Sequence, residues 1–341
     1  MTTLVTGATG FVGWHVARLL NERIGRVRVL VRPASRVRAA RILAGLTVDP
    51  VPGDLRDRSS LAKALEGTTQ VFHVAADYRL WARDPDEIYE SNVQGTRNLI
   101  EASEHAGVEK FVYTSSVATM AVPKNDGLPD ERTEARLDQM VGHYKRSKLM
   151  AENDVMNAAR KGFPAVVVNP TTPVGPGDWK PTPTGRIIVD FLNGRMPAYV
   201  NTGFNVVAVE DVAEGHWLAA NNGCIGERYI LGERNIALKD FLAIIAAATG
   251  RTAPRIRLPY AVALAAGHLE SFFSSATGRE PRIPLEGVRM ARHKMYVDPS
   301  RAMRELGFRP GGIEAAIGRA VQWYIQNGYA PGRHLRSIEV A

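Results

Sequence analysis

The sequence predicts an α/β protein in which a doubly wound parallel sheet is joined to a smaller C-terminal lobe. Short valine-rich runs, typical of buried parallel strands, alternate with amphipathic helical segments over the first half of the chain. A glycine-rich turn joins the first predicted strand to the first predicted helix. A length of 341 residues also exceeds the size at which one hydrophobic core usually stops growing, which favours an added lobe.

The predicted strands and helices alternate from the N-terminus onward. The first strand is a short apolar run that ends in glycine, and the helix after it carries apolar residues at helical spacing. Gly67 ends the second helix. The predicted strands are 3–7, 27–32, one within 46–54, 70–76, 109–116 and 165–170, and the predicted helices are 11–23, 61–67, 92–107 and 143–160.

The character of the sequence changes after residue 170. The stretch "TTPVGPGDWKPTPTG" is dense in proline and glycine and is typical of a loop over a site. In contrast, "NVVAVEDVAEGHWLAA" (205–220) predicts a strand and a helix that return to the main sheet. We expect a sheet domain of 1–170 plus about 204–231, a substrate lobe of 171–203 plus about 232–330, and a loosely held tail at 331–341.

One apolar stretch of the lobe, "LPYAVALAAGHLESFF" (258–273), has two interpretations. It is either a core helix, which we favour, or a patch that makes weak contact with a membrane surface or a lipid-like substrate. Its longest apolar run, 258–267, is about half of the roughly 20 residues that cross a bilayer, so we expect no transmembrane segment.

The composition is typical of a folded cytosolic protein. Hydrophobic residues make up 45% of the chain and charged residues 23%, so no long polar tract has to stay disordered. The single cysteine, Cys224, forms no internal disulfide, and we expect no metal site. The N-terminus "MTTLVTGATG" lacks the order of a signal peptide, so we expect a cytoplasmic protein.

The basic charge has to be weighed as a possible nucleic-acid signal. The net charge is +8, and seven arginines fall between Arg23 and Arg41. That stretch contains no Phe, Tyr or Trp, whereas RNA-binding modules interleave aromatic stacking platforms with arginine. We therefore expect a small-molecule substrate, no nucleic acid, and arginines that lie beside a site for an anionic cofactor.

The glycine turn carries the first chemical signal. Gly7, Gly10 and Gly13 in "TGATGFVG" have the spacing G-x-x-G-x-x-G, a variant of the dinucleotide fingerprint. Glycine permits the tight turn and lets the backbone approach a pyrophosphate at a helix N-terminus. Together with the flanking strand and helix, the turn predicts a Rossmann dinucleotide-binding domain.

The end of the second strand indicates which dinucleotide binds. An NAD-selective site places an acid there, whereas an arginine accommodates the 2′-phosphate of NADP. The residues "LVRPASR" contain no acid, and Arg32, with Ser35 and Arg36 close by, can meet a phosphate. NADP is therefore favoured over NAD. Asp54, just past the third strand, either accepts a hydrogen bond from adenine or serves a turn or helix cap.

Tyr144 and Lys148 in "YKRSK" are the second chemical signal. Four residues apart on a helix, they project from one face, so the ammonium can lie beside the phenol and lower its pKa from about 10. Ser116 ends the "VYTSS" strand, where ligands of such sheets bind, and can hold a substrate oxygen. The three residues predict a hydride-transfer site.

The chain resembles the extended short-chain dehydrogenase/reductase superfamily from about residue 2 to 328. The matching segments are "TGATGFVG", "GDLRD", "HVAA", "NVQGTRNL", "VYTSS", "YKRSK" and "VDPSRAMRELGFRP". Within the superfamily it looks most like the dihydroflavonol-4-reductase-like branch. In particular, "PVGPGDWKPTPTGRII" closely resembles the hopanoid-associated sugar epimerase family.

The resemblance implies roles for individual residues and a homodimer formed through helices at about 92–106 and 144–160. It implies that Ser116, Tyr144 and Lys148 are catalytic. The residues implied around the cofactor are Gly7, Gly10, Phe11, Val12, Gly13, Arg32, Asp54, Leu55, Ala75, Ala76, Tyr144, Lys148 and Pro170. From the residues themselves, Tyr78 and Trp81 either line the substrate pocket or pack beneath a loop, and Arg186 either meets a phosphate or is a solvated surface charge. Ser116 and Thr172 are the other candidates to meet substrate.

The end of the sixth strand departs from the pattern of sugar-nucleotide enzymes. Those enzymes tend to carry Arg-Pro and then an asparagine, whereas this chain reads "NPTTPVGP", with Asn169 and Thr172 in those places. We therefore predict an NADP-dependent oxidoreductase that acts on a carbonyl or secondary alcohol. A sugar-like substrate of hopanoid metabolism is one candidate. The alternatives are a sugar epimerase or dehydratase that oxidises its substrate transiently, and a non-catalytic NADP sensor.

Overall fold

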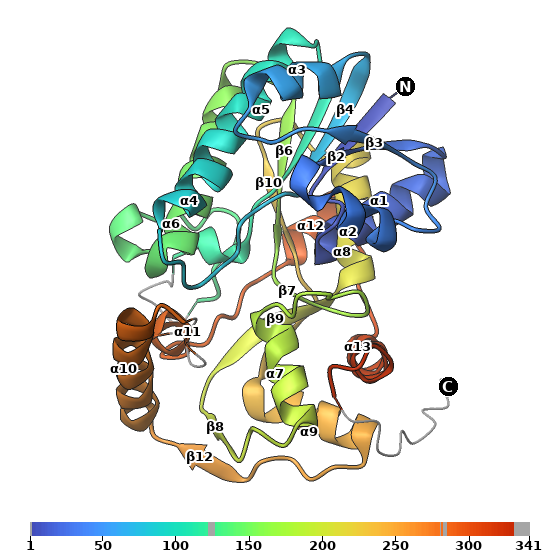
Figure 1. Ribbon diagram of the computed structural model, residues 1–341. Coiled ribbons are helices and arrows are strands. Elements are labelled where there is room, and N and C mark those ends of the chain that lie inside the picture. The colour runs from blue at the N-terminus through green and yellow to red at the C-terminus, as the bar shows by residue number, and fades with distance from the viewer. Residues whose placement is uncertain (1, 122–126, 280, 282–284, 331–341) are drawn as a thin grey trace.

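The computed structural model describes residues 2–121, 127–279, 281 and 285–330. The predicted tail at 331–341 lies outside these residues. Figure 1 shows two parts, a sheet covered by helices on both faces and a smaller lobe beneath it. We refer to them as the sheet domain and the substrate lobe.

The sheet domain is built on a seven-stranded sheet in the order β10-β6-β5-β4-β1-β2-β3. Every neighbouring pair of strands is parallel, which confirms the predicted doubly wound α/β fold. Because the chain crosses from β3 to β4, the carboxyl ends of β1 and β4 flank the point where ligands of such sheets bind. The strands are β1 (Thr2–Thr6), β2 (Val27–Val31), β3 (Val48–Pro52), β4 (Thr68–His73), β5 (Lys110–Thr114), β6 (Ala165–Pro170) and β10 (Arg228–Leu231).

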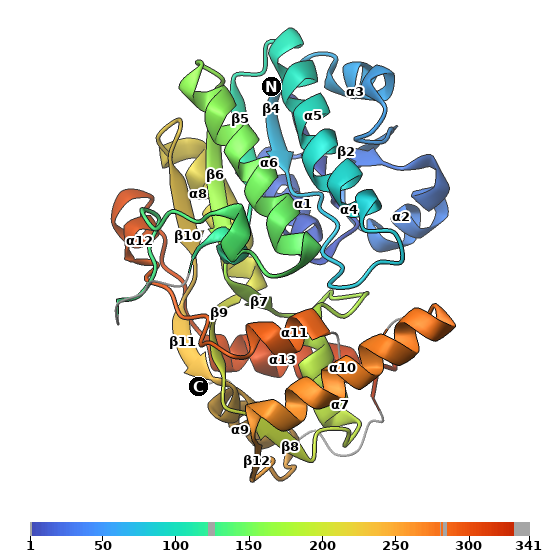
Figure 2. The same ribbon diagram turned by 90° about the vertical axis from the view of Figure 1, so that its left-hand side faces the viewer.

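Helices cover both faces of this sheet (Figures 1 and 2). One apolar core lies beneath α1, α2, α8 and α12, and a second lies beneath α3, α5 and α6. The helices are α1 (Phe11–Ile24), α2 (Arg36–Ile42), α3 (Arg58–Leu65), α4 (Asp86–Tyr89), α5 (Gly95–His105), α6 (Gly142–Arg160), α8 (Val209–Asn222) and α12 (Ser300–Glu305). Short turns of helix lie at Pro33–Ser35, Glu90–Gln94, Val117–Thr119 and Leu137–Gln139.

The substrate lobe contains two small sheets. The first has the order β11-β9-β7, and the second pairs β12 with β8. Its strands are β7 (Thr172–Val174), β8 (Ala198–Val200), β9 (Gly203–Ala208), β11 (Arg234–Ala237) and β12 (Ile256–Leu258). Its helices are α7 (Pro183–Leu192), α9 (Leu238–Thr249), α10 (Tyr260–Thr277), α11 (Leu285–Met290) and α13 (Ile313–Gln326).

One predicted strand lies in a different sheet from the one expected. The strand within 205–220 was expected to return to the main sheet, but β9 pairs with β7 and β11 in the lobe. The helix after it, α8, does pack on the main sheet. All of β9 is buried, and an apolar strand of this kind fits either sheet equally well. The residue ranges proposed for the two domains stay a prediction.

The apolar stretch at 258–273 forms most of α10, and our preference for a core helix was wrong. Phe272 and Phe273 are 71% and 61% exposed. Gly267 and Ser274 are the buried positions among the helix residues whose side chains are described. Figures 1 and 2 show α10 at the outer edge of the lobe, with α11 beside it.

Within the described part of the chain, no helix combines the length and the apolar character that a membrane crossing requires.

Candidate active site

The glycine turn packs tightly between β1, α1 and the segment after β4. Gly7 has a φ of +75°, and a Cβ atom built there would lie 2.6 Å from the backbone nitrogen of Ala75. A Cβ at Gly13 would collide with the Gly7 carbonyl, so a side chain there would push α1 away from the turn. The Gly10 amide donates to the Gly7 carbonyl at 2.8 Å. The turn therefore depends on glycine for its shape.

The N-terminus of α1 suits a phosphate group. Gly10 precedes the helix without a side-chain cap, and no acidic residue lies in the first turn, which contains Phe11, Val12 and Gly13. The unpaired amides and the helix dipole favour an anion at this position. These features fit the pyrophosphate of a dinucleotide.

The other predicted cofactor residues also follow the carboxyl ends of main-sheet strands. Arg32, directly after β2, is exposed, and Ser35 is half-buried. Ala75 and Ala76 follow β4 and are half-buried, whereas Leu55 and Pro170 are buried. The fold thus gathers residues that are distant in the sequence at one edge of the sheet.

Asp54 is engaged by a neighbouring arginine. Its Oδ1 atom accepts hydrogen bonds from the backbone and Nε of Arg56, both at 3.0 Å, and its Oδ2 atom accepts from Nη2 at 2.9 Å. The side-chain hydrogen bond to Arg56 lowers the pKa of Asp54. These contacts fit one of the two roles considered for Asp54, which is to stabilise the turn after β3. The other role, accepting a hydrogen bond from adenine, stays a prediction.

Ser116 and Tyr144 are brought together. Ser116 follows β5, and its Oγ atom accepts a hydrogen bond from the Ala118 amide at 3.1 Å. Tyr144 lies in the first turn of α6. Burial raises the pKa of the Tyr144 phenol, and a side-chain hydrogen bond with Ser116 acts in the opposite direction. Both side chains are half-buried, so each keeps an accessible surface.

Lys148 contacts Tyr113 and Thr114, whereas we expected it to lie beside Tyr144. Its Nζ atom donates to the Tyr113 hydroxyl and to the Thr114 carbonyl, both at 2.8 Å. The lysine is only 2% exposed, and burial lowers its pKa to about 7 although Glu152 acts in the opposite direction. We expected the ammonium to lower the pKa of Tyr144. Instead, its long side chain reaches β5, and the pKa of Tyr144 is raised by burial.

The Tyr113 hydroxyl belongs to a buried network that the sequence reasoning missed. Tyr113 has a side-chain hydrogen bond with Thr96, whose Oγ1 atom lies 3.0 Å from Nε2 of His73. The other ring nitrogen of His73 lies 2.8 Å from the Thr6 hydroxyl. Burial lowers the pKa of His73 to about 3, so its ring is neutral at pH 7. The network connects Lys148 to β1, and the phenol within the apolar "VYTSS" strand was its only sequence signal.

Asn169 supports Ser116 from behind. Its Nδ2 atom donates to the Ser116 carbonyl at 3.1 Å and to a Glu152 carboxylate oxygen at 2.8 Å. The other oxygen of Glu152 accepts from Arg228 at 2.7 Å. The sequence identified Asn169 only as a departure from a pattern, whereas the structure gives it a positioning contact.

Asn92 fastens the segment after β4 to α6. Its amide group accepts from the Asp77 backbone nitrogen at 2.7 Å and donates to the Asp77 carbonyl at 2.8 Å and to the Ser147 hydroxyl at 3.0 Å. Asn92 lies in the π-helical turn Glu90–Gln94, an irregularity that is frequent at functional sites. This asparagine was present in the quoted "NVQGTRNL" segment but was given no role.

The predicted substrate residues come from both parts of the molecule. The Tyr78 hydroxyl donates to the Lys180 carbonyl at 3.1 Å, which ties the segment after β4 to the loop before α7. Burial raises the pKa of Tyr78 to about 12. Arg186 of α7 is close enough to act electrostatically on Tyr78. Trp81 and Thr172 are half-buried.

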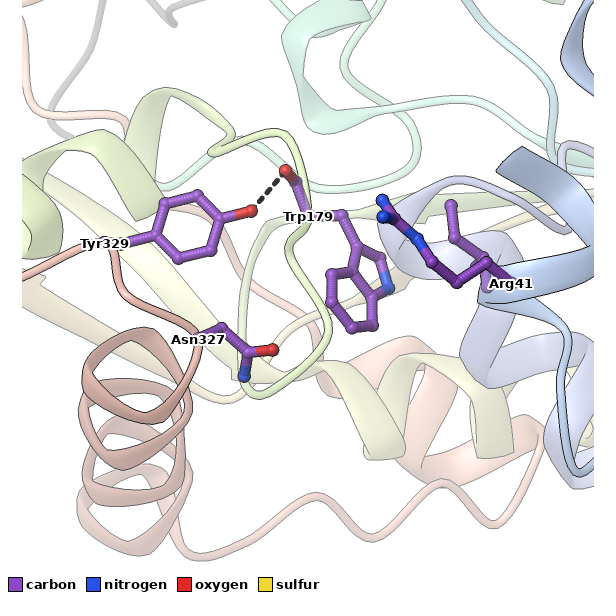
Figure 3. Close-up of a pocket in the computed structure, with 5 residues that line it drawn as sticks. Arg41, Trp179, Asn327 and Tyr329 are labelled. Carbon is purple, nitrogen blue, oxygen red and sulfur yellow. Dashed lines mark hydrogen bonds between the residues drawn. The ribbon is translucent and has the colours of Figure 1, made fainter. Parts of the chain in front are cut away.

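A separate cavity of about 340 Å³ lies between the end of α2, the loop before α7 and the end of α13. Figure 3 shows the Arg41 guanidinium facing the Trp179 indole across it, and the Tyr329 hydroxyl donates to the Trp179 carbonyl at 2.6 Å. Ile42 and Asn327 complete the lining. None of these residues belongs to the predicted catalytic set.

A Rossmann sheet, a glycine turn open to a pyrophosphate and a serine–tyrosine pair at the same sheet edge define an NAD(P)-binding enzyme of the extended short-chain dehydrogenase/reductase type. The chain belongs to the NAD dependent epimerase/dehydratase family, whose sequence model matches residues 3–232. This confirms the predicted superfamily and the predicted class of enzyme.

Individual relatives cover nearly the whole chain. A putative dihydroflavonol 4-reductase of Synechocystis sp. is 44% identical over 95% of each chain. Sterol demethylase protein B of Methylococcus capsulatus is 36% identical over 96% of this chain and 99% of its own. The crystal structure of gox2253 has a TM-score of 0.85 and 45% identity, and the match covers 96% of this chain and 99% of that one.

Proposed function

We propose that this protein is an NADP-dependent oxidoreductase that transfers a hydride between NADP(H) and a carbonyl or secondary alcohol. The pairing of Ser116 with Tyr144, at the same edge of the sheet as the glycine turn, carries the proposal. NADPH, when bound, supplies the hydride to the carbonyl carbon. The protein's part is to bind the substrate oxygen, to supply one proton and to exclude competing reactions.

Tyr144 is the proposed acid and base. Its neutral phenol, favoured by the raised pKa, donates a proton to the substrate oxygen during reduction, and the phenolate takes it back during oxidation. The Ser116 hydroxyl donates a hydrogen bond to the same oxygen. Hydride plus proton converts the ketone to the alcohol, so no further reactant is needed.

Lys148 is proposed to orient the cofactor and to set the local charge. Its pKa of about 7 means that part of the population is neutral before cofactor binds near neutral pH. The hydrogen bond that Nζ donates to Tyr113 keeps the amine near the sheet edge. Ribose hydroxyls at this edge would favour the charged form, because they accept hydrogen bonds from it.

NADP is proposed over NAD because of Arg32. Arg32 is exposed directly after β2, and the next helix supplies Arg36 and no acid in its first turn. We expect Arg32→Glu to lower kcat/KM for NADPH by about tenfold or more and to leave kcat/KM for NADH nearly unchanged, since one charge-assisted contact to the 2′-phosphate is lost. A change of equal size with both cofactors would contradict the preference.

The proposed substrate is a ketone or alcohol on a largely apolar skeleton. The names of the dihydroflavonol 4-reductase and sterol demethylase relatives both indicate polycyclic substrates, and "NPTTPVGP" lacks the arginine of sugar-nucleotide enzymes. A sugar-like substrate of hopanoid metabolism is the second class to test. Both classes belong in one substrate panel.

The test follows oxidation of NADPH by absorbance with a panel of flavanonols, steroid ketones and keto-sugars. We expect turnover with at least one member, and a fall of about 10²- to 10⁴-fold in Tyr144→Phe with unchanged NADPH affinity. Tyr89→Phe is the matched control, because it removes a nearby phenol that contacts His143. Full activity in Tyr144→Phe would overturn the proposal.

Epimerisation is the alternative, because the matching family includes epimerases. An epimerase retains its cofactor and returns the hydride to the same substrate, whereas a reductase consumes NADPH stoichiometrically. Mass spectrometry of the freshly purified protein separates the two. Tightly held NADP(H), together with product formation in the absence of added cofactor, would favour the epimerase.

A further inference from the structure

The outward face of α10 is apolar. Val262, Leu269, Phe272 and Phe273 are 53%, 60%, 71% and 61% exposed. They recur at helical spacing, so they form one stripe, and the exposed Ala261 and Ala265 fall within it. A surface helix of a globular protein normally turns such a stripe inward. A contiguous exposed stripe of this kind usually marks a surface that meets an apolar partner.

Packing among the residues that the structure describes does not account for this stripe. Gly267, on the opposite side of α10, faces α11, because a Cβ atom there would lie 3.3 Å from side-chain atoms of Leu285 and Val288. Figures 1 and 2 show α11 beside α10, on the side toward the sheet domain, and α10 at the outer edge of the lobe. The helix therefore meets α11 through the small residue Gly267 and presents the four large apolar residues of the stripe outward.

Arginines lie at both ends of the stripe. Arg255 and Arg257 come just before α10, with the 63% exposed Ile256 between them, and Arg279 follows the helix. All three arginines are exposed, and none forms an ion pair with the residues that the structure describes. Glu270, the one acidic residue of α10, falls outside the exposed stripe.

We propose that α10, together with Arg255 and Arg257, docks the protein onto an anionic lipid bilayer. The helix would lie in the plane of the membrane, with Phe272 and Phe273 at the boundary between headgroups and acyl chains and the arginines at lipid phosphates. A helix with an apolar face and flanking cations binds in this way without crossing the bilayer. This proposal is independent of the proposed function.

Charge complementarity selects lipid over a second copy of the chain. A dimer formed through this stripe would bring together surfaces that each carry the same arginines, and the chain has a net charge of +8. An anionic bilayer supplies both the apolar layer and the opposite charge. The homodimer that the sequence resemblance implies uses α5 and α6 and leaves α10 free.

The docking helix is also close to the proposed active site. The α11 carboxylate Glu286 lies against Gly142 at the start of α6, and it accepts a hydrogen bond from the His143 backbone nitrogen. Tyr144 is the next residue along the helix. The membrane would therefore meet the outer side of α10, and α11 would connect α10 to the start of the catalytic helix.

The experiment measures flotation of the full-length protein with vesicles. One set contains equal parts of phosphatidylglycerol and phosphatidylcholine, and the other contains phosphatidylcholine alone. We expect at least about tenfold stronger partitioning onto the anionic set, and weakening by salt. The double variant Phe272→Ser/Phe273→Ser should lose about tenfold or more, and Arg255→Gln/Arg257→Gln should lose mainly the preference for anionic lipid.

The matched control is Ile225→Ser. Ile225 is 61% exposed, like Phe273, but lies in the loop before β10. We expect this variant to bind vesicles as the parent protein does, and all variants to keep NADPH affinity and melting temperature. Absence of vesicle binding by the parent protein, or an equal loss in Ile225→Ser, would overturn the proposal. Self-association that requires Phe272 and Phe273, without vesicle binding, would also overturn it and assign the face to a second copy.

Discussion

The long helices α6 and α10 break the usual rule of burial in opposite directions. On α6, the charged Lys148 is 2% exposed. On α10, Phe272 is 71% exposed. Each arrangement lowers the stability of an isolated folded chain. Burial removes water from the Lys148 ammonium, and exposure leaves the apolar ring of Phe272 in contact with water. The comparison teaches that a buried charged residue or an exposed large apolar residue on a helix is a strong candidate for function.

Among the changes that test this comparison, the largest effect is expected at the buried lysine. Lys148→Met should lower kcat/KM by about 10²-fold or more, because the variant lacks the ammonium group that is proposed to orient the cofactor and to set the local charge. The same change should raise the unfolding free energy of the cofactor-free protein by about 1 to 4 kcal/mol, since a buried charge is replaced by an apolar group of similar length. Activity assays and thermal melts check both parts.

The stability gain should depend on pH in a defined direction. The pKa of Lys148 is about 7 in the folded protein and 10.5 in the unfolded chain, so the unfolded chain binds more protons between these values. Stability of the parent protein therefore rises with pH in this window, and the advantage of Lys148→Met shrinks. A gain that is constant from neutral to alkaline pH would contradict this account.

The next effect concerns the hydroxyl that Lys148 contacts. Tyr113→Phe removes an acceptor from the charged amine, so the pKa of Lys148 should fall further. We expect kcat/KM to fall by about tenfold. The charged form of Lys148 is the one proposed to bind the ribose, so activity should decline as pH rises through the pKa of Lys148, and in Tyr113→Phe this decline should occur at lower pH. Tyr324→Phe is the control, because its buried hydroxyl contacts Asp178 instead. An unchanged pH profile in Tyr113→Phe would limit that hydroxyl to a structural role.

A smaller effect is expected behind Ser116. Asn169→Ala removes the donor to the Ser116 carbonyl and to Glu152, which should cost about 1 to 3 kcal/mol of unfolding free energy. It should also lower kcat several-fold because Ser116 is less well positioned. Asn193→Ala removes a similar pair of contacts in the lobe and should lose stability without the change in kcat. Equal kcat in both variants would contradict the positioning role.

The smallest expected effect is on α10. Phe272→Ser/Phe273→Ser should change the unfolding free energy by less than about 1 kcal/mol, because both rings are already exposed. Phe241→Ala, in the buried core of the lobe, should cost about 3 to 5 kcal/mol. Urea unfolding compares the two. A large loss in the double variant would show that α10 supports the fold and would remove the contrast with α6.

Much of the sheet domain was predictable because its signals are local. Gly7 and Gly13 each meet a steric requirement that leaves a mark in the sequence, and buried strands read as valine-rich runs. Ser116, which follows β5, lies beside Tyr144 in the first turn of α6, because segments that follow parallel strands meet at one edge of the sheet. These predictions depended on backbone geometry that neighbouring residues determine.

The remaining features depend on contacts between distant segments. The apolar residues of β9 fit either sheet, and the pairing with β7 is decided by the lobe. The spacing of Tyr144 and Lys148 gives a shared face, but not the direction of a long side chain that finds Tyr113. The apolar residues of α10 have the same pattern whether the stripe faces a core or a membrane.

The central claim is that the Tyr144 phenol, held by Ser116, moves the proton in an NADP-dependent hydride transfer. The most direct measurement is transfer of deuterium from NADPH labelled at the reactive carbon to the best ketone of the panel. The account predicts labelled alcohol from the parent protein and almost none from Tyr144→Phe, at equal NADPH affinity. Label transfer at the same rate in both proteins would contradict it.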